Sequence, residues 1–209
     1  MSEFPTIRGC PSLLLRPWTE SDAPALRAAI DEDVGHLKPW LSWTLEEPAT
    51  LERTRARLRG YVDQYLSGQA FRYAITPGNE PSLILGGAHL NFRVGPDAHD
   101  VGYWVRRSAV RQGIAAAAVS ALVVHCFTHR GVDRLVIQSD VANAASIALA
   151  AALRFRFAGL VDTRFPDGSP RPVCQFELAG GDYRLRHEPE LRDRARRVRL
   201  LTDAPDPND

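Results

Sequence analysis

The chain has 209 residues, of which 44% are hydrophobic and 24% charged, the composition of an ordinary folded domain. Its 26 basic and 25 acidic residues leave a net charge of +1, so overall charge does not attract it to nucleic acid or to an anionic membrane. The cysteines at positions 10, 126 and 174 are far apart and have no histidine at metal-ligand spacing, so we expect reduced thiols and no metal. Because neither a signal-peptide pattern nor a long apolar run is present, we also expect a cytoplasmic protein without a membrane partner.

The first part of the chain alternates one strand with helical segments. Residues 12–16 form a short apolar run typical of a strand, and Thr19 or Ser21 can cap the helix that follows it. Residues 36–43 contain two tryptophans around a proline and indicate a loop or a short helix. Residues 50–66 predict an amphipathic helix whose apolar face would carry four side chains, namely Leu51, Leu58, Val62 and Leu66.

From residue 70 the apolar period changes to that of strands. Three runs, separated by turns at residues 77–79 and 95–97, predict an antiparallel meander. They are followed by a helix over residues 113–129, a buried strand over 133–139, a helix over 144–153 and a closing hairpin formed by 155–163 and 172–178. The order predicts an α/β (α+β) fold on a mixed, mostly antiparallel sheet. A helical crossover joins residues 100–106 to 133–139, and a cleft is expected beside it.

One stretch of the sequence contains a candidate ligand-binding turn. Residues 100–118, DVGYWVRRSAVRQGIAAAA, pass from a strand through a basic turn into an alanine-rich helix that begins after Gly113. The N–H groups of a first helical turn have no carbonyl partner within the helix, and small side chains leave them uncrowded, so this turn suits a diphosphate. The alternative is an ordinary helix start in which glycine serves only close packing.

Several segments that lie apart in the sequence resemble segments of one protein family, and they occur in the same order as in that family. GYWV, VRQGIA and NAASIALAAALRF resemble the GCN5-related N-acetyltransferase (GNAT) superfamily, and LLLRPWTESDAPAL and HLKPWLSW resemble its ribosomal-protein (RimJ/RimL-type) branch. The resemblance spans about residues 12–180. It implies a sheet of about seven strands flanked by about four helices, with a V-shaped splay between two central strands. We expect one domain over residues 1–183 and a charged tail over 184–209 that is partly helical or disordered.

The resemblance implies acetyl-CoA or another acyl-CoA as cosubstrate. Gly113 and Ala115 match the family's phosphate-binding pattern, whereas Val110 replaces its usual Gln or Arg. The binding comes from backbone N–H groups, so the departure is modest. The expected cofactor-binding residues are Tyr103, Trp104, Val105, Arg111, Gln112, Gly113, Ile114, Ala115, Ala116, Asn143 and Ser146. An N–H near Val105 would polarise the thioester carbonyl, while the side chains of Tyr103 and Trp104 can equally belong to the core.

The resemblance identifies catalytic residues less directly than cofactor-binding residues. Many relatives have a tyrosine acid where this chain has Ala150, so Ser146 becomes the candidate general acid. Asp100 and His89 are rival candidates for the base that receives the amine proton. Trp40 and Trp43 are expected to line the acceptor side, unless they only fill the core. Glu46, Glu47 and Glu52 would attract a cationic acceptor or form a solvated acidic face.

The resulting hypothesis is an N-acyltransferase that moves acetyl, or succinyl or another short acyl group, from acyl-CoA to the primary amine of a protein N-terminus or a small molecule. The alternative is a non-catalytic acyl-CoA-binding sensor or interaction module of the same fold, suggested by the departures at Val110, Ala150 and Arg154. The expected partners are acyl-CoA and an amine acceptor, and the resemblance makes a homodimer plausible. No nucleic-acid partner is expected.

Overall fold

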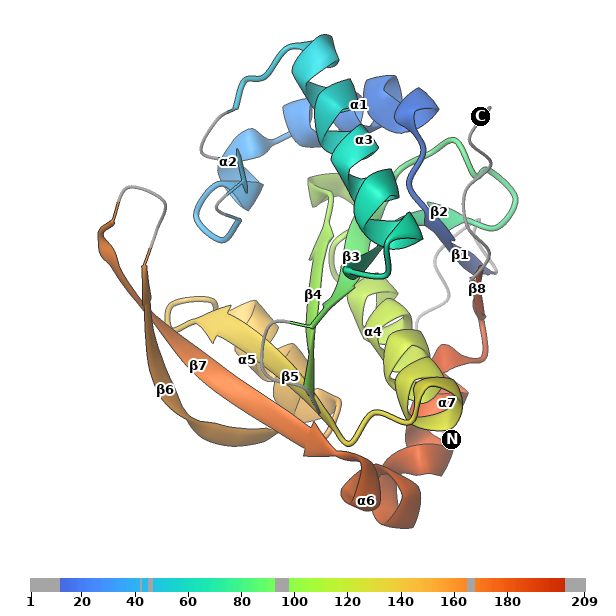
Figure 1. Ribbon diagram of the computed structural model, residues 1–209, viewed down its shortest axis with the longest axis vertical. Helices are drawn as coiled ribbons and strands as arrows, with labels where there is room; N and C mark the ends of the chain where they lie inside the picture. The colour runs from blue at the N-terminus through green and yellow to red at the C-terminus, as the bar shows by residue number, and fades with distance from the viewer. Residues whose placement is uncertain (1–11, 42, 45–46, 93–97, 165–167, 202–209) are drawn as a thin grey trace.

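The computed structural model describes residues 12–41, 43–44, 47–92, 98–164 and 168–201. Its centre is one eight-stranded sheet in the order β6-β7-β5-β4-β3-β2-β1-β8 (Figure 1). Two neighbouring pairs, β4 with β5 and β1 with β8, are parallel, and the other pairs are antiparallel. The strands are β1 (Leu13–Pro17), β2 (Ala70–Pro77), β3 (Gly86–Asn91), β4 (Ala98–Val105), β5 (Arg134–Asp140), β6 (Arg156–Arg164), β7 (Pro170–Ala179) and β8 (Val198–Leu200).

Helices cover both faces of the sheet. They are α1 (Ala23–Asp31), α2 (Val34–Leu37), α3 (Leu51–Leu66), α4 (Ile114–His125), α5 (Ala144–Ala152), α6 (Gly180–Asp182) and α7 (Glu188–Ala195). The apolar residues of α4 pack with one side of β2, including Tyr73 and Ile75, whereas Leu26 of α1 and Leu58 of α3 pack with Ala74, which points to the other side. This division follows from strand geometry, because successive side chains point to opposite faces. Figure 1 shows α1, α2 and α3 gathered at one end of the molecule.

The central strands open into a splay. β4 and β5 pair only at residues 98–100 with 134–136. Beyond that point β4 stays with β3 as far as Val105, and β5 stays with β7 as far as Asp140, so the two strands diverge (Figure 1). The predicted meander, crossover and V-shaped splay are therefore confirmed.

The buried face of α3 differs from the predicted one. Thr54, Leu58 and Tyr65 are buried, whereas Leu51 is 39% and Leu66 56% exposed. Steps of four residues drift around a helix by about 40° each. The predicted series 58, 62, 66 therefore leaves the face that packs on α1 and β2, while steps of four, seven and eleven from Thr54 stay on it.

The tail contributes to the fold. Helix α7 contacts α4 and buries Leu191, and β8 adds an eighth strand beside β1, with Leu13 N–H donating to the Arg197 carbonyl at 2.8 Å. The division at residue 183 stays a prediction. The predicted disorder at the C-terminal end, like the turn at residues 95–97, lies outside the described residues. Within the described ranges, none of the helices has the length and apolar character that a membrane span needs, and no cluster of potential metal ligands occurs.

Candidate active site

The turn before α4 has the geometry of a phosphate cradle. Gly113 caps the helix with φ of +71°, and Arg111 also has a positive φ, +60°. The first backbone bond into the helix runs from the Ala117 N–H to the Gly113 carbonyl at 3.0 Å. The N–H groups of the preceding turn, Ile114 to Ala116, thus have no partner inside the helix and remain available to an anion.

The side chains of this turn have other roles. Gln112 donates through Nε2 to the Ser108 carbonyl at 3.0 Å, and Arg111 is exposed. Arg197 from the tail donates through Nη2 to the Gln112 carbonyl at 3.3 Å, next to Gly113. The predicted contribution of this turn through backbone N–H groups is therefore consistent with its geometry, and a guanidinium that sequence reasoning did not include lies beside it.

An apolar cleft leads from the cradle to the splay. It has a volume of about 300 Å³, and its lining includes Val105, Val110, Ile114 and Leu149. Val110, which departs from the family pattern, thus lines the apolar part of the cleft. Along β4 the Arg106 N–H donates to the Leu85 carbonyl, so strand alternation directs the Val105 N–H away from β3 and toward the splay. A carbonyl group bound there can be polarised by that N–H.

Two hydroxyl groups meet at the inner end of the cleft. The Tyr103 hydroxyl on β4 lies 2.9 Å from Ser146 Oγ on α5. Asn143 positions Ser146, because its Oδ1 accepts the Ser146 N–H at 3.1 Å as the cap of α5. Burial raises the pKa of Tyr103 to about 12, although the hydrogen bond with Ser146 acts in the opposite direction. Sequence reasoning gave Tyr103 as a cofactor-binding residue whose side chain could instead belong to the core, and the separation of 43 residues hid its proximity to Ser146.

A second, larger cavity lies on the acceptor side. It has a volume of about 710 Å³, and Asp100, His89, Trp40 and Trp43 all line it. The two cavities share the lining residues Trp40, Leu41, Tyr103, Trp104, Asn143 and Ser146. A donor in the apolar cleft and an acceptor in the larger cavity would therefore meet at the splay.

The two candidate bases form one pair. His89 Nε2 lies 3.6 Å from Asp100 Oδ2, which also accepts a hydrogen bond from Asn91 Nδ2 at 3.3 Å. Gly102 makes room for the imidazole, since a Cβ at that position would lie 2.1 Å from His89 Cε1. The sequence presented Asp100 and His89 as rivals; the structure places them together on the acceptor side.

Tryptophans form part of the cavity wall. Trp43 and Trp104 contact each other edge to face with centroids 6.0 Å apart, and the Arg57 guanidinium lies 4.9 Å from the centre of the Trp43 ring. The Trp40 carbonyl accepts a hydrogen bond from Arg171 Nη2 at 2.7 Å, which ties this segment to β7. Trp40 and Trp43 are both partly exposed and line the cavity, and Trp43 also packs against the core, so their role as an acceptor wall stays a prediction.

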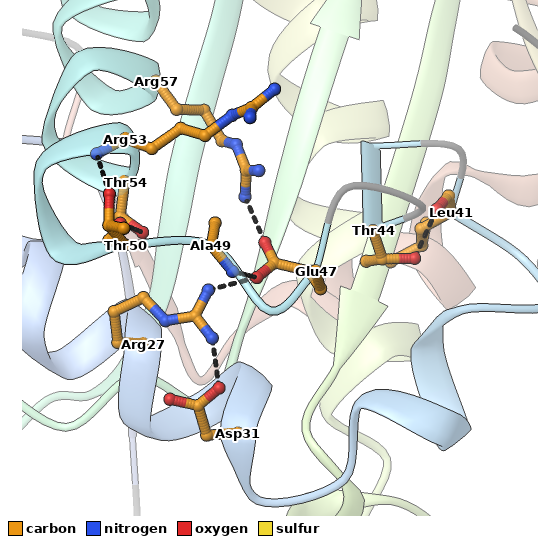
Figure 2. Close-up of polar contacts among 10 residues, drawn as sticks. All are labelled: Arg27, Asp31, Leu41, Thr44, Glu47, Ala49, Thr50, Arg53, Thr54 and Arg57. Carbon is orange, nitrogen blue, oxygen red and sulfur yellow. Dashed lines mark hydrogen bonds and ion pairs between the residues drawn. The ribbon is translucent and has the colours of Figure 1, made fainter.

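Glu47 is an internal anchor (Figure 2). Its carboxylate accepts hydrogen bonds from Arg27, from Arg57 Nη1 at 3.0 Å and from the Ala49 N–H at 2.8 Å, and its side chain is fully buried. Burial raises the pKa of Glu47, but these hydrogen bonds outweigh burial and hold it below its usual value. Both interpretations of Glu47, as an attractant for cations or as a solvated residue, are therefore wrong. Glu52 is exposed, and Glu46 lies outside the described residues.

The described thiols do not form an activated nucleophile. Cys126 is buried in the core, and burial raises its pKa to about 12. Cys174 lies on β7, partly buried, and is not among the residues that line either cavity. A thiolate is the nucleophilic form of cysteine, so direct transfer is favoured over a covalent acyl-enzyme.

Comparison with known proteins agrees with this geometry. A search of the curated proteins found no match. Among solved structures, RimL, a ribosomal L7/L12 alpha-N-protein acetyltransferase in complex with coenzyme A, is 27% identical with a TM-score of 0.71, covering 80% of this chain and 94% of that one. The acetyl transferase of Salmonella typhimurium that modifies the N-terminal serine of L7/L12 is 26% identical with a TM-score of 0.70, covering 80% and 95%.

A further structure supports the fold alone, because its identity is low. RimJ of Mycobacterium smegmatis, in complex with CoA-disulfide, is 23% identical with a TM-score of 0.74 and covers 88% of each chain. The family model of the acetyltransferase (GNAT) domain matches residues 12–156, more than half of the chain. The chain therefore belongs to the GNAT acetyltransferases, and within that family it is similar to the ribosomal-protein N-acetyltransferase RimL.

Proposed function

We propose that the protein transfers an acyl group, acetyl first of all, from acyl-CoA to a primary amine by direct attack within a ternary complex. The observation that carries this proposal is the meeting of two cavities at Tyr103 and Ser146, one leading to the phosphate cradle and the other lined by the His89–Asp100 pair. The relatives bound to coenzyme A support the donor. No metal takes part in this mechanism.

The cradle and β4 bind and polarise the donor. The backbone N–H groups over residues 111–116 bind the diphosphate, with the positive end of the α4 dipole behind them. The apolar cleft takes the pantetheine arm, and Asn143 and Trp104 line its inner end. The Val105 N–H then stabilises the negative charge that develops on the thioester oxygen.

The acceptor amine must be neutral when it attacks. The His89–Asp100 pair receives its proton, directly or through one water, because both groups line the acceptor cavity. The amine nitrogen bonds to the thioester carbon, the C–S bond breaks, and the electron pair leaves with sulfur as a thiolate.

The hydroxyl pair acts on that thiolate. A thiol has a pKa of about 8.5, well below the value of about 12 for Tyr103, so complete proton transfer from the phenol to sulfur is uphill. Ser146 and Tyr103 therefore stabilise the leaving thiolate chiefly by hydrogen bonding, and solvent supplies the final proton. Hydrogen bonds to charged groups contribute about 1.5–3 kcal/mol each, roughly 10- to 150-fold in rate.

A protein N-terminus is the acceptor class that the likeness to RimL supports. The alternative of a non-catalytic sensor is not favoured, because the matching family model is that of an acetyltransferase domain. The site also contains a pair that can accept the amine proton on one side of the splay and hydroxyl groups that can stabilise the leaving thiolate on the other. A cytoplasmic location and a homodimer remain part of the proposal, and light scattering on the purified protein tests the dimer.

Two measurements test the proposal. Isothermal titration with acetyl-CoA and succinyl-CoA should detect binding, and a thiol-release assay over a panel of N-terminal peptides and small amines should detect turnover. Asn143→Ala should weaken cofactor affinity more than turnover, and Ser146→Ala should do the reverse. Absence of binding of either acyl-CoA at high micromolar concentration would refute the function, and equal small effects of the two substitutions would refute the assigned roles.

A further inference from the structure

Three side chains of the acceptor cavity form a basic wall, which we call the Arg57–Tyr61–Arg72 wall. Arg57 and Tyr61 lie one turn apart on α3, Arg72 lies on β2, and all three line the cavity. The Arg72 guanidinium lies 4.8 Å from the centre of the Tyr61 ring. Burial raises the pKa of the Tyr61 phenol, and the positive charges of Arg72 and Arg57 both oppose that shift, so both charges act at its hydroxyl.

The wall is held in place by contacts with neighbouring side chains. Arg57 donates a hydrogen bond to the buried Glu47, as Figure 2 shows. Its guanidinium also lies over the Trp43 ring. Arg72 donates through Nε to Gln64 Oε1 at 2.9 Å and through Nη2 to Asn91 Oδ1 at 3.5 Å. Amide oxygens orient a guanidinium without neutralising it, so neither of these two contacts cancels the positive charge of Arg72.

The wall adjoins the groups that receive the amine proton. Arg72 is the cross-strand neighbour of His89, and Asn91, which accepts from Arg72, donates to Asp100. Directly paired residues of neighbouring strands have their Cβ atoms roughly 4.5–5.5 Å apart. One small ligand could therefore place its anionic group at Arg72 and its amine, a few covalent bonds away, at the His89–Asp100 pair.

The charges around the cavity agree with this arrangement. Among the described residues, Arg57, Arg72, Arg164 and Arg171 line it together with only two carboxylates, Asp100 and Asp140. Asp140 already pairs with Arg171 at 3.4 Å. Planar guanidinium groups bind carboxylates through two parallel hydrogen bonds, which fixes orientation as well as charge.

On the basis of the proposed function, we infer that the acceptor carries a carboxylate a few bonds from its reactive amine, and that the Arg57–Tyr61–Arg72 wall binds this carboxylate. Such an acceptor is either a free amino acid or an N-terminus followed by an acidic residue. A polycationic amine such as spermidine, by contrast, meets like charge at this wall and is a poor acceptor.

Matched pairs of ligands test the inference by titration into protein saturated with CoA, so that no turnover is needed. L-Phenylalanine against L-phenylalaninamide probes free amino acids, and Ser-Asp-Ala against Ser-Asn-Ala, both as C-terminal amides, probes N-termini. In at least one pair the carboxylate member should bind at least tenfold more tightly. The ligand pair whose two members differ in affinity shows whether the acceptor is a free amino acid or an N-terminus.

Variants connect the preference to the wall. Arg72→Gln should reduce the ratio to about twofold or less, and Tyr61→Phe should reduce it in part with little risk to folding. Arg59→Gln is the matched control, because Arg59 lies on α3 but is exposed and pairs with Glu20 at 2.9 Å. Equal binding within both pairs, absence of binding by all four ligands, or a ratio that survives Arg72→Gln would overturn the inference. The acyl-CoA titration is independent of these outcomes and separately decides the proposed function.

Discussion

Replacing Glu47 with Gln should destabilise the protein strongly. The carboxylate accepts two charge-assisted hydrogen bonds, from Arg27 and Arg57, and one from a backbone N–H. At about 1.5–3 kcal/mol for each charge-assisted bond, the loss amounts to about 3–6 kcal/mol. This range agrees with the roughly 3–5 kcal/mol measured when one partner of a buried ion pair is removed. For a chain of this size, about 2–4 °C per kcal/mol predicts a fall in Tm of roughly 6–24 °C.

Chemical denaturation followed by circular dichroism measures this loss, with Glu52→Gln as the control, because Glu52 is an exposed carboxylate at the start of the same helix. The pH dependence gives a second readout. The pKa of Glu47 is lowered in the folded state, so its stabilisation is present above the ordinary glutamate pKa and is lost as the pH falls toward its folded value. Glu47→Gln should lack this acid-sensitive component. A loss below about 0.5 kcal/mol, within the usual range of surface substitutions, would refute the assignment of Glu47 as an anchor.

Three further changes test the site. Tyr103→Phe should lower kcat about 10- to 100-fold with little change in the KM for acetyl-CoA. Because the pKa of Tyr103 is about 12, ionisation of this residue should not lower the wild-type rate below about pH 10. An unchanged kcat in peptide turnover would count against the hydroxyl pair. Gly102→Ala should displace the His89 ring and lower kcat/KM at least tenfold while Tm changes little, and steady-state kinetics at several pH values would detect it. Arg197→Gln should raise the Kd for CoA about three- to tenfold in titration. The silent control is Arg199→Gln, two residues further on in β8, and equal effects of both substitutions would exclude a specific contact at the cradle.

The order of elements was predictable because it rests on local patterns. The alternation in residues 70–105 and the glycine before the alanine-rich helix are short-range signals, and each sets the local backbone directly. The resemblance added the splay and the ligand. The backbone N–H groups of Gly113 to Ala116 are present whatever the side chains are. This explains why the departure at Val110 leaves the cradle geometry intact.

Contacts between residues distant in sequence were not predictable in the same way. The sequence Glu46-Glu47-Pro48 has the composition of a surface loop, and only the packing of α1 against α3 brings Arg27 and Arg57 to Glu47. The pairing of β8 with β1 joins the ends of the described chain, and a three-residue strand has no period that a sequence can reveal. Burial of charge was missed for the same reason: it depends on which partners the fold supplies.

Successive side chains of β4 point to opposite faces of the sheet, and the two faces serve different parts of the proposed reaction. Asp100, Gly102 and Trp104 face the side of the acceptor cavity, where Gly102 accommodates His89 and Trp104 contacts Trp43. Tyr103 and Val105 face the side of α4 and α5, where the phenol meets Ser146. A shift of one residue in the register of β4 would exchange these faces and place the hydroxyl with the base. The double pairing of β4, with β3 at residues 100–105 and with β5 at residues 98–100, fixes that register beside the point where the sheet must open to admit the thioester.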